Sequence, residues 1–379
     1  MFKFITILVI VSVSFAGHLV GWGSDNYGQV SNIPTGEDFI QASCGSCHAI
    51  ALRSDSTLVA WGNNGSGQGV VPADLEDETF IFIAAGAGHN VAIKADSTLV
   101  AWGLNDDSQC DCPTGKFIDI AAGVKHSVGL RSDGSIVTWG YTFGDPDPIG
   151  YLWISVTSSR YRCAALRWLN NNTSVFITWG TDDDGILYPL GYFGEFIEIA
   201  DGECASAIDS ISPGVSYIRE WDYESNQWVN NGQPNQPGDY HGLTRSETHG
   251  FAIEDGELIG WGDNEYGALD IEGLNAGYLS INAGHHFSIG IQETGTGIAG
   301  SPEPTLNLSV LANPSASPMI QFTTDTAVEL SIYDISGRTV SNESYGPGDH
   351  SVSPMLSTGI YLVRLEAVNQ ELLARLVAL

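Results

Sequence analysis

Short strands with alternating apolar and polar positions recur along most of the chain. One series ends in tryptophan followed by glycine, as in LVAWG and IVTWG, at Trp22, Trp61, Trp102, Trp139, Trp179 and Trp261. YIREWD around Trp221 is a degenerate copy, and neighbouring copies lie 37 to 42 residues apart. Period-two alternation between turn residues predicts strands, and an even spacing near forty residues predicts the blades of a β-propeller.

A second series keeps step with the tryptophan strands. It reads AAGAGHNVAI ending at Ile93 and AAGVKHSVGL ending at Leu130, with weaker copies further along the chain. Histidine recurs at one position of this series, at His48, His89, His126 and His249. That position shares a strand face with apolar residues two and four positions later. We therefore interpret these histidines as half-buried, hydrogen-bonded structural residues.

One copy of this second series reads SCGSCH, in which Cys44, Cys47 and His48 form the C-x-x-C-H pattern that attaches c-type haem. The histidine already belongs to the repeat, and the cysteines stand where the next copy has Ala85 and Gly88. An attached haem also needs a pocket and a second axial ligand, and both methionines after Met1 lie in the C-terminal segment. We predict no haem, no metal and no other cofactor.

Counting the two series predicts the topology. Seven strands of each kind are present, but the chain starts with a tryptophan strand at 18–23 and the repeats end with a glycine–histidine strand at 280–291. Pairing the first strand with the last closes a ring and removes open sheet edges. The predicted fold class is all-β: a seven-bladed β-propeller closed by its N-terminal strand, plus a small C-terminal β-sandwich.

The paired signature AGxxHxxAL and LVAWGxNxxGQ resembles the repeat of the regulator of chromosome condensation superfamily. WGSDNYGQ from Trp22 and WGNNGSGQ from Trp61 carry the resemblance, which covers about residues 17 to 293. The short, forty-residue form is most similar to bacterial type II β-lactamase inhibitor proteins, which are seven-bladed propellers. The resemblance implies the fold specifically, and the function only loosely.

The resemblance also implies a partner-binding face. In the inhibitor proteins this face includes the two residues before the histidine position, which are often aromatic. Here those positions include Ala87, Gly88, Glu247 and Thr248, and the face that we predict comprises Ser46, Val124, Lys125, Arg160, Tyr161, Glu203, His285 and His286. Only Tyr161 is an aromatic anchor of the kind that dominates tight interfaces, so we expect protein binding through this face but not β-lactamase inhibition.

The composition changes after Ile291 to QETGTGIAGSPEPT, which is typical of a linker. The alternating runs AVELSIYDI and GIYLVRLEA that follow predict a small β-sandwich. The sequences YDISGRTV, STGIYLVRL and LLARLVAL resemble the C-terminal sorting domain of the bacterial type IX secretion system, with Arg375 where a lysine is common. The alternative is an accessory immunoglobulin-like domain. The predicted boundaries are 1–16 for a signal peptide, 17–293 for the propeller, 294–304 for the linker and 305–379 for the sorting domain.

Charge and the N-terminus limit the partners. Forty-five acidic residues against fourteen basic ones give a formal net charge of −31, which repels nucleic acid and anionic lipid surfaces.

Residues 1–16 contain Lys3, the apolar run FITILVIVSVSF and small residues at Ser14 and Ala16, a pattern typical of a secretory signal peptide. We expect no membrane span in the mature chain. We expect it outside a Gram-negative cell or on its outer surface, reached through the periplasm, with the type IX machinery engaging 305–379. Such export is incompatible with the nucleotide exchange on a small GTPase that the nuclear branch of the superfamily performs.

No catalytic motif is present, so we predict a protein-binding module without enzymatic activity. One alternative is a lectin-like adhesin, in which Trp153, Trp168 and Trp228 would stack on sugar rings, although these residues also fit blade packing. A second is a metal-dependent enzyme that uses the repeated histidines around a central channel. The acidic runs 182–184 and 263–265 follow tryptophan strands and fit solvated turns, and the first is also a candidate calcium loop. The six cysteines allow disulfides, including a strained one between Cys110 and Cys112, but the sequence does not pair them.

Overall fold

The computed structural model describes residues 9–12, 16–141, 153–170, 173–182, 185–194, 196–201, 205–212, 215–222, 227–230, 232–234, 236–254, 256–271, 277–293, 306–311, 319–324, 327–334, 339–352, 359–367 and 370–378. The chain divides into two compact units, one of residues 16–294 and one of residues 1–15 with 295–379. Among the described residues the only helix is a 3-10 turn at Ala73–Leu75. None of them forms a helix with the length and apolar composition that a bilayer crossing requires.

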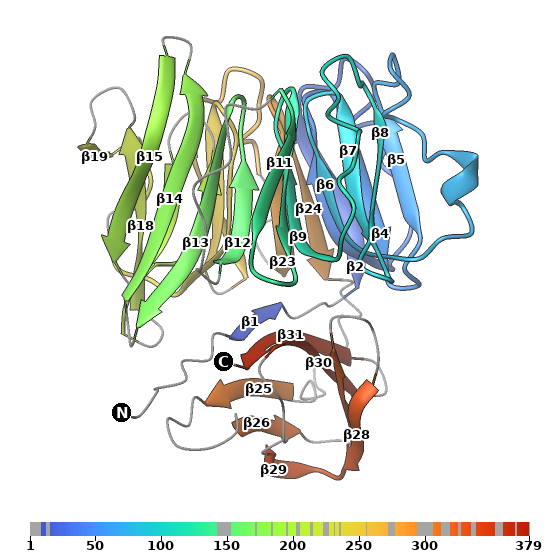
Figure 1. Ribbon diagram of the computed structural model, residues 1–379, viewed down its shortest axis with the longest axis vertical. Helices are drawn as coiled ribbons and strands as arrows, with labels where there is room; N and C mark the ends of the chain where they lie inside the picture. Colours follow the sequence, from blue (N-terminus) through green and yellow to red (C-terminus); the bar gives the residue numbers. More distant parts are fainter. Residues whose placement is uncertain are drawn as a thin grey trace. The chain divides into compact units, whose positions relative to one another are not determined.

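The larger unit is built from antiparallel groups of three or four strands (Figure 1). The three-stranded groups are β3 (Phe39–Cys44), β4 (His48–Arg53) and β5 (Leu58–Gly62); β6 (Phe80–Ala85), β7 (His89–Lys94) and β8 (Leu99–Gly103); β9 (Phe117–Ala122), β10 (His126–Arg131) and β11 (Ile136–Gly140); and β20 (Tyr240–Arg245), β21 (His249–Glu254) and β22 (Glu257–Gly262). The four-stranded sheets are β12 (Trp153–Ser158), β13 (Arg162–Asn170), β14 (Thr173–Asp182) and β15 (Gly185–Gly194); and β16 (Phe196–Asp201), β17 (Ala205–Ser212), β18 (Val215–Asp222) and β19 (Gln227–Val229). The all-β prediction is therefore confirmed, with one repeat of the two sequence series in each group of strands.

An aromatic residue starts the first strand of each group and is buried. These residues are Phe39, Phe80, Phe117, Trp153, Phe196, Tyr240 and Tyr278, none more than 4% exposed. In three copies an arginine of the second strand lies over the ring, at 5.0 Å for Arg53 on Phe39, 5.6 Å for Arg131 on Phe117 and 5.3 Å for Arg167 on Trp153. The aromatic position thus anchors each sheet by burial and, in these copies, by a cation–π contact.

The second strands are more deeply buried than the sequence suggests. In β4, β7, β10 and β21 the first five residues are all buried, so both faces of the strand are covered. Neighbouring sheets pack against each face, and small residues such as Ala49 and Ala92 alternate there with larger ones. Half-buried histidines were the expectation at the first position of these strands, but the packing of a sheet on each face buries them fully.

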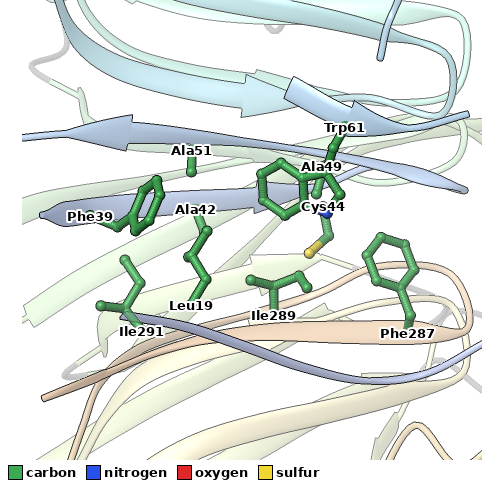
Figure 2. Close-up of a cluster of buried hydrophobic side chains, with 10 residues drawn as sticks. All are labelled: Leu19, Phe39, Ala42, Cys44, Ala49, Ala51, Trp61, Phe287, Ile289 and Ile291. Carbon is green, nitrogen blue, oxygen red and sulfur yellow. The ribbon is translucent and has the colours of Figure 1, made fainter. Parts of the chain in front are cut away.

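The first strand of the larger unit pairs with its last. β2 (Gly17–Gly23) runs antiparallel to β24 (Phe287–Glu293) with Gly17 opposite Glu293 and Gly23 opposite Phe287, while β23 (Tyr278–Ala283) pairs with the other edge of β24. This group of β23, β24 and β2 joins the group of β3 to β5 into one six-stranded sheet through a single residue pair, Gly17 with Phe39. One buried cluster contains residues from both ends of the repeat region: Leu19, Phe39, Ala42, Cys44, Ala49, Ala51, Trp61, Phe287, Ile289 and Ile291 (Figure 2). The two ends of the repeat region therefore share one core.

The smaller unit contains two sheets. One has the order β1 (Val9–Ser12), β31 (Gln370–Ala378), β30 (Gly359–Ala367), β27 (Val328–Asp334) and β28 (Thr339–Tyr345), and the other has the order β25 (Leu306–Leu311), β26 (Met319–Thr324) and β29 (Gly348–Val352). In β27 the apolar residues Val328, Leu330 and Ile332 share one face and are buried, and Ser331 on the other face is buried as well. β1 lies within the segment predicted to be a signal peptide and pairs with β31.

Candidate functional site

The repeated histidines are fully buried and tie each repeat to another. His48, His89 and His249 are 0% exposed and His126 is 4% exposed. Each Nε2 lies 2.9 Å from a polar side chain of another repeat: His48 from Asn90, His89 from Ser127, His126 from Ser158 and His249 from Ser288. Burial lowers the pKa of these imidazoles to about 4, 3, 4 and 4, respectively. They are neutral at pH 7 and are bonded inside the protein, so they are poorly placed for catalysis or metal binding.

The glycine of the AGxxH motif makes room for the histidine ring. A Cβ on Gly45, Gly86 or Gly123 would lie 2.3 to 2.4 Å from Cε1 of the histidine three residues later. The same Cβ would lie within 2.5 Å of a backbone carbonyl of the next repeat. The glycine and the histidine of the motif thus form one packing unit between repeats.

The WGxNxxGQ segment after each tryptophan is also structural. The indole N–H of Trp61 donates to the carbonyl of Gln29 at 2.9 Å, and that of Trp139 donates to the carbonyl of Gln109 at 2.9 Å. The Gln29 side chain is 2% exposed, and its Oε1 accepts the Tyr27 amide at 2.9 Å. These motif residues satisfy one another's hydrogen bonds, so the residues beside them, which vary between repeats, are the ones left to make other contacts.

The side chains of the C-x-x-C-H segment are likewise engaged in contacts inside the protein. The Nε2–H of His48 donates to Asn90, and the Cys44 thiol donates to the carbonyl of Asn282 at 3.5 Å. Burial raises the pKa of Cys44 and of Cys47, so neither is an activated thiolate. The buried imidazole is not available to an iron. Among the described residues, Cys44, Cys47, Cys110 and Cys112 are free thiols, so the bridge that the sequence allows between Cys110 and Cys112 is not formed. Cys204 lies outside the described residues.

The variable residues gather on one face. In each sheet the histidine position pairs with the glycine that follows tryptophan, as His48 does with Gly62, so the turn before the second strand and the loop after the third lie at the same end. We call this end the upper face. In the described part of the chain it comprises the turns 45–47, 86–88, 123–125, 159–161, 246–248 and 284–286 and the loops 24–32, 63–72, 104–113 and 263–271.

A central cavity of about 280 Å³ opens among these turns. It is lined by residues of β3, β6, β9, β12, β16, β20 and β23 and, at the upper face, by Ser46, Ala87, Val124, Arg160, Glu247 and His285. The first residue of each predicted pair therefore faces the cavity mouth. The three residues from the first three turns have small, uncharged side chains. The three from the turns between β12 and β13, β20 and β21, and β23 and β24 are ionisable. Glu203, the remaining predicted residue, lies outside the described residues.

The ionisable side chains at the mouth contact one another although they come from separate repeats. Glu247 Oε2 lies 3.1 Å from His285 Nε2, and Glu247 Oε1 lies 4.0 Å from Arg160 Nε. The hydrogen bond to His285 is the main cause that lowers the pKa of Glu247, opposed by its partial burial. Thr248 Oγ1 donates to the carbonyl of His285 at 2.9 Å, which joins the two turns.

Three tyrosines that follow tryptophan strands are exposed. Tyr27, Tyr141 and Tyr266 are 53%, 50% and 47% exposed, and each lies two or five residues after the tryptophan. Sequence reasoning singled out only Tyr161 as an aromatic anchor and missed these three. The recurrence of tyrosine in the loop after the Trp-Gly pair is the sequence signal that could have identified them.

Two of the upper-face cations are held between a tyrosine ring and a carboxylate. Lys125 Nζ lies 5.8 Å from the Tyr141 ring centroid and 3.4 Å from Asp107 Oδ2. The Arg160 guanidinium lies 5.2 Å from the Tyr161 ring centroid and also faces a carboxylate of the mouth. Each arrangement combines a π face with an anion, which is how proteins bind ammonium and guanidinium groups.

The residues proposed for other chemistry are placed differently. Trp153 is 3% exposed and packs in a core cluster, so it is not a sugar-stacking platform. The side chains of Trp168 and Trp228, and residues 183 and 184 of the first acidic run, lie outside the described residues. In the second run, the Asp263 carboxylate accepts the Glu265 amide at 2.9 Å. Within the described residues, no three His, Cys, Asp or Glu side chains are grouped closely enough to hold a metal ion.

Comparison with known families confirms both sequence resemblances. Residues 39–68, 80–109 and 117–142 match the regulator of chromosome condensation (RCC1) repeat, and residues 310–378 match the secretion system C-terminal sorting domain. No curated protein matches the chain in sequence.

Solved structures share the fold at low sequence identity. Human WBSCR16 is 14% identical with a TM-score of 0.56, covering 77% of this chain and 100% of its own. Prp20p from Saccharomyces cerevisiae, described with its binding to Gsp1p and histones, is 15% identical with a TM-score of 0.57, covering 75% and 94%. The ectodomain of the Arabidopsis thaliana receptor kinase ACR4 is 17% identical with a TM-score of 0.50, covering 69% and 97%. These likenesses establish the propeller type of fold.

Proposed function

We propose that this chain, which carries RCC1 repeats and a secretion system C-terminal sorting domain, is an exported module that binds another protein through its upper face. It has no catalytic role in this proposal. The propeller presents the variable residues, and the sorting domain delivers the propeller to the outside of a bacterial cell or to its outer surface. The type IX machinery is then the partner of residues 305–379.

The proposal includes a closed ring of seven blades. Three observations support this. β2 completes the sheet of β23 and β24, and the first strands of seven groups line one cavity. A third comes from the contacts between repeats: the Cys44 amide donates to Asn282 Oδ1 at 2.8 Å, just as the Ala85 amide donates to Ser43 Oγ at 2.9 Å. The last sheet thus contacts the first as neighbours in sequence contact each other.

The observation that carries the binding proposal is the cluster of Arg160, Glu247 and His285 at the cavity mouth. These residues come from three different repeats, are partly exposed and do not serve the repeat motif. The motif residues themselves are engaged in bonds inside the protein, so the upper face has the variable, exposed and aromatic character of an interaction surface.

The experiment uses the mature full chain, residues 17–379, immobilised and exposed to secreted and surface proteins of the source cell. Saturable capture of one defined protein, lost in the double variant Arg160→Ala/Tyr161→Ala, is the expected result. Arg219→Ala is the matched control, because Arg219 also lies over a tyrosine ring, at 5.1 Å from that of Tyr217, and 3.4 Å from the Asp209 carboxylate, but outside the upper face.

Two results contradict the proposal. Capture that the upper-face variant and the control affect equally would show that the upper face is not the binding surface. Capture that survives protease treatment of the bound material and is competed by free sugars would make the protein a glycan-binding adhesin instead.

A further inference from the structure

The upper face is strongly acidic. Among its described residues it has eight carboxylates, Asp25, Asp106, Asp107, Asp111, Glu247, Asp263, Glu265 and Asp270, against two cations, Lys125 and Arg160. Both cations are already paired with carboxylates of the same face. A face with this charge attracts basic partners and repels acidic ones, over distances of about 10 Å at moderate salt.

A third aromatic–carboxylate group on this face holds no lysine or arginine among the described residues. The Tyr266 ring is tilted against the His286 ring with centroids 4.2 Å apart, and His286 contacts His285 at 3.8 Å. Asp263 and Glu265 lie in the same loop as Tyr266 and are exposed. In the part of the chain that the structure describes, no lysine or arginine lies over the Tyr266 ring, whereas Lys125 and Arg160 lie over Tyr141 and Tyr161.

The electrostatics of this third group suit a cation from outside. Burial and the neighbouring His285 lower the pKa of His286, while the charges of Asp263, Glu247 and Glu265 oppose that shift. At pH 7 the His286 ring is therefore predominantly neutral and adds an aromatic surface without a competing positive charge. The nearby carboxylates supply the negative charge that the other two groups also have.

Resting on the proposed function, we infer that Tyr266, His286, Asp263 and Glu265 form a cradle for a lysine or arginine side chain of the partner protein, so that the partner presents a basic segment to the upper face. Lys125 and Arg160 fill the two corresponding positions from within the protein. The partner's cation fills the third, beside the cavity mouth. Binding brings a guanidinium or ammonium over the Tyr266 ring and next to the two carboxylates.

The test uses the full mature chain and a defined probe, the peptide acetyl-Gly-Gly-Arg-Gly-Gly-amide, with a citrulline peptide as the neutral isostere. Binding is followed by the aromatic resonances of Tyr266 and His286 in NMR titrations at low salt. We expect the arginine peptide to bind and the citrulline peptide to bind at least about fivefold more weakly. Equal shifts for the two peptides would overturn the proposal.

Variants make the test specific to the cradle. Tyr266→Ala, and separately Asp263→Asn with Glu265→Gln, should each weaken peptide binding by about fivefold or more. Tyr141→Ala should leave it unchanged, because Lys125 already occupies that ring. Lys125→Ala should remove the internal cation from the Tyr141 ring and the Asp107 carboxylate. A second peptide can then bind there, and the number of bound peptides per chain should rise from one to two. Unchanged affinity in Tyr266→Ala, or unchanged stoichiometry in Lys125→Ala, would contradict the inference.

The experiments distinguish a failure of the proposed protein-binding function from a failure of the proposed cation cradle. If the peptide does not bind but protein capture depends on Arg160 and Tyr161, the upper face is an interface and the cradle is wrong. If the peptide binds through Tyr266 but no protein is captured, the cradle stands and the proposed function is wrong.

Discussion

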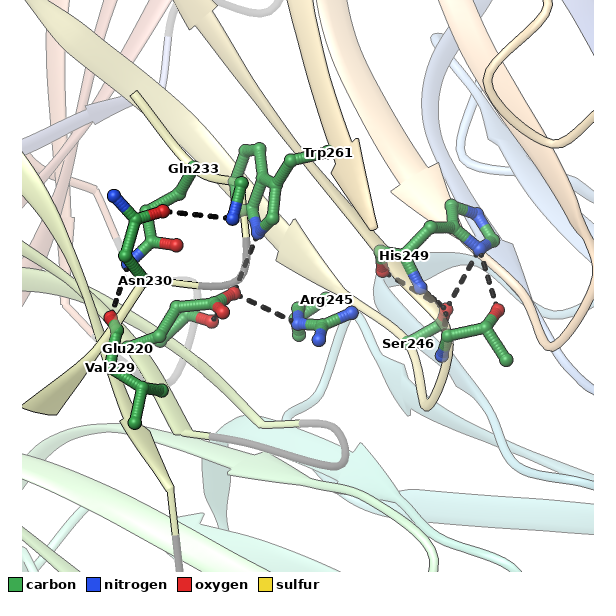
Figure 3. Close-up of polar contacts among 11 residues, drawn as sticks. Glu220, Val229, Asn230, Gln233, Arg245, Ser246, His249 and Trp261 are labelled. Carbon is green, nitrogen blue, oxygen red and sulfur yellow. Dashed lines mark hydrogen bonds and ion pairs between the residues drawn. The ribbon is translucent and has the colours of Figure 1, made fainter. Parts of the chain in front are cut away.

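The indole N–H of Trp261 donates to Glu220 Oε1 at 2.6 Å, across a sequence separation of 41 residues (Figure 3). In Trp22, Trp61 and Trp139 the same N–H donates to a backbone carbonyl of the WGxNxxGQ loop in the preceding repeat. The degenerate repeat around Trp221 lacks that loop sequence, and the Glu220 carboxylate takes the place of the missing carbonyl. The same oxygen lies 3.0 Å from Arg245 Nε, and both side chains are buried.

Glu220→Ala should strongly destabilise the propeller. The substitution leaves the Arg245 guanidinium, 3% exposed, without its anion and the Trp261 N–H without its acceptor. Removing one partner of a buried ion pair typically costs about 3 to 5 kcal/mol in the free energy of unfolding. Urea unfolding followed by tryptophan fluorescence measures the loss. The control is Arg219→Ala, one residue away and exposed, for which a change of at most about 0.5 kcal/mol is expected. Equal stabilities of the two variants would show that the pair does not support the degenerate repeat.

Gly86→Ala should destabilise the contact between the second and third repeats. The added Cβ would lie 2.4 Å from His89 Cε1 and 2.5 Å from the Gly123 carbonyl, and one of these is backbone that cannot swing away. We expect a loss of about 2 kcal/mol or more, typical of overpacking at a buried site. Gly65→Ala is the control, because its only near atom is the Asn63 side-chain oxygen at 3.3 Å. A Gly86→Ala protein as stable as the Gly65→Ala protein would contradict the packing role assigned to the AGxxH glycine.

Much of the repeat architecture could be predicted because it is periodic and local. The spacing of tryptophan and histidine identifies the strands, since each repeat uses the same contacts with its neighbour. The cluster of Arg160 and Glu247 could not be predicted, because the two residues are 87 positions apart and meet only through the way the sheets are arranged. The stacking of Tyr266 on His286 is likewise a contact between two different loops. The structural role of Glu220 could not be predicted for a different reason. It lies in the degenerate repeat, where the repeat pattern gives no guide, and it bonds Trp261 and Arg245.

Acid should destabilise the propeller in the range between pH 6.5 and about 4. His48, His89, His126 and His249 have folded pKa values near 3 to 4, below the ordinary value of 6.5. Between those values the unfolded chain binds protons that the folded protein does not, so stability is complete above pH 6.5 and falls as the pH drops. Each pKa unit of difference corresponds to about 1.4 kcal/mol per histidine.

Urea unfolding at several pH values checks this slope. His89→Gln keeps a side-chain donor for Ser127 and removes one titrating group. The slope of the free energy of unfolding against pH should therefore decrease by an amount that corresponds to at most one proton. If His89→Gln has the slope of the unmodified protein, the buried histidine does not couple folding to pH.

Removing β2 should open the ring. β2 covers one edge of β24 along Phe287–Glu293 and contributes Leu19 and Trp22 to two different core clusters. A chain that starts at Ser24 therefore exposes the edge amides of β24 and leaves part of the shared core of Figure 2 open to water. Hydrogen exchange should then accelerate in β24 and in β3, which lies against β23 and β24, and much less in β10 on another sheet. Adding a synthetic peptide of residues 17–23 should restore part of the protection. Unchanged exchange in β24 after the deletion would show that β2 does not close the propeller.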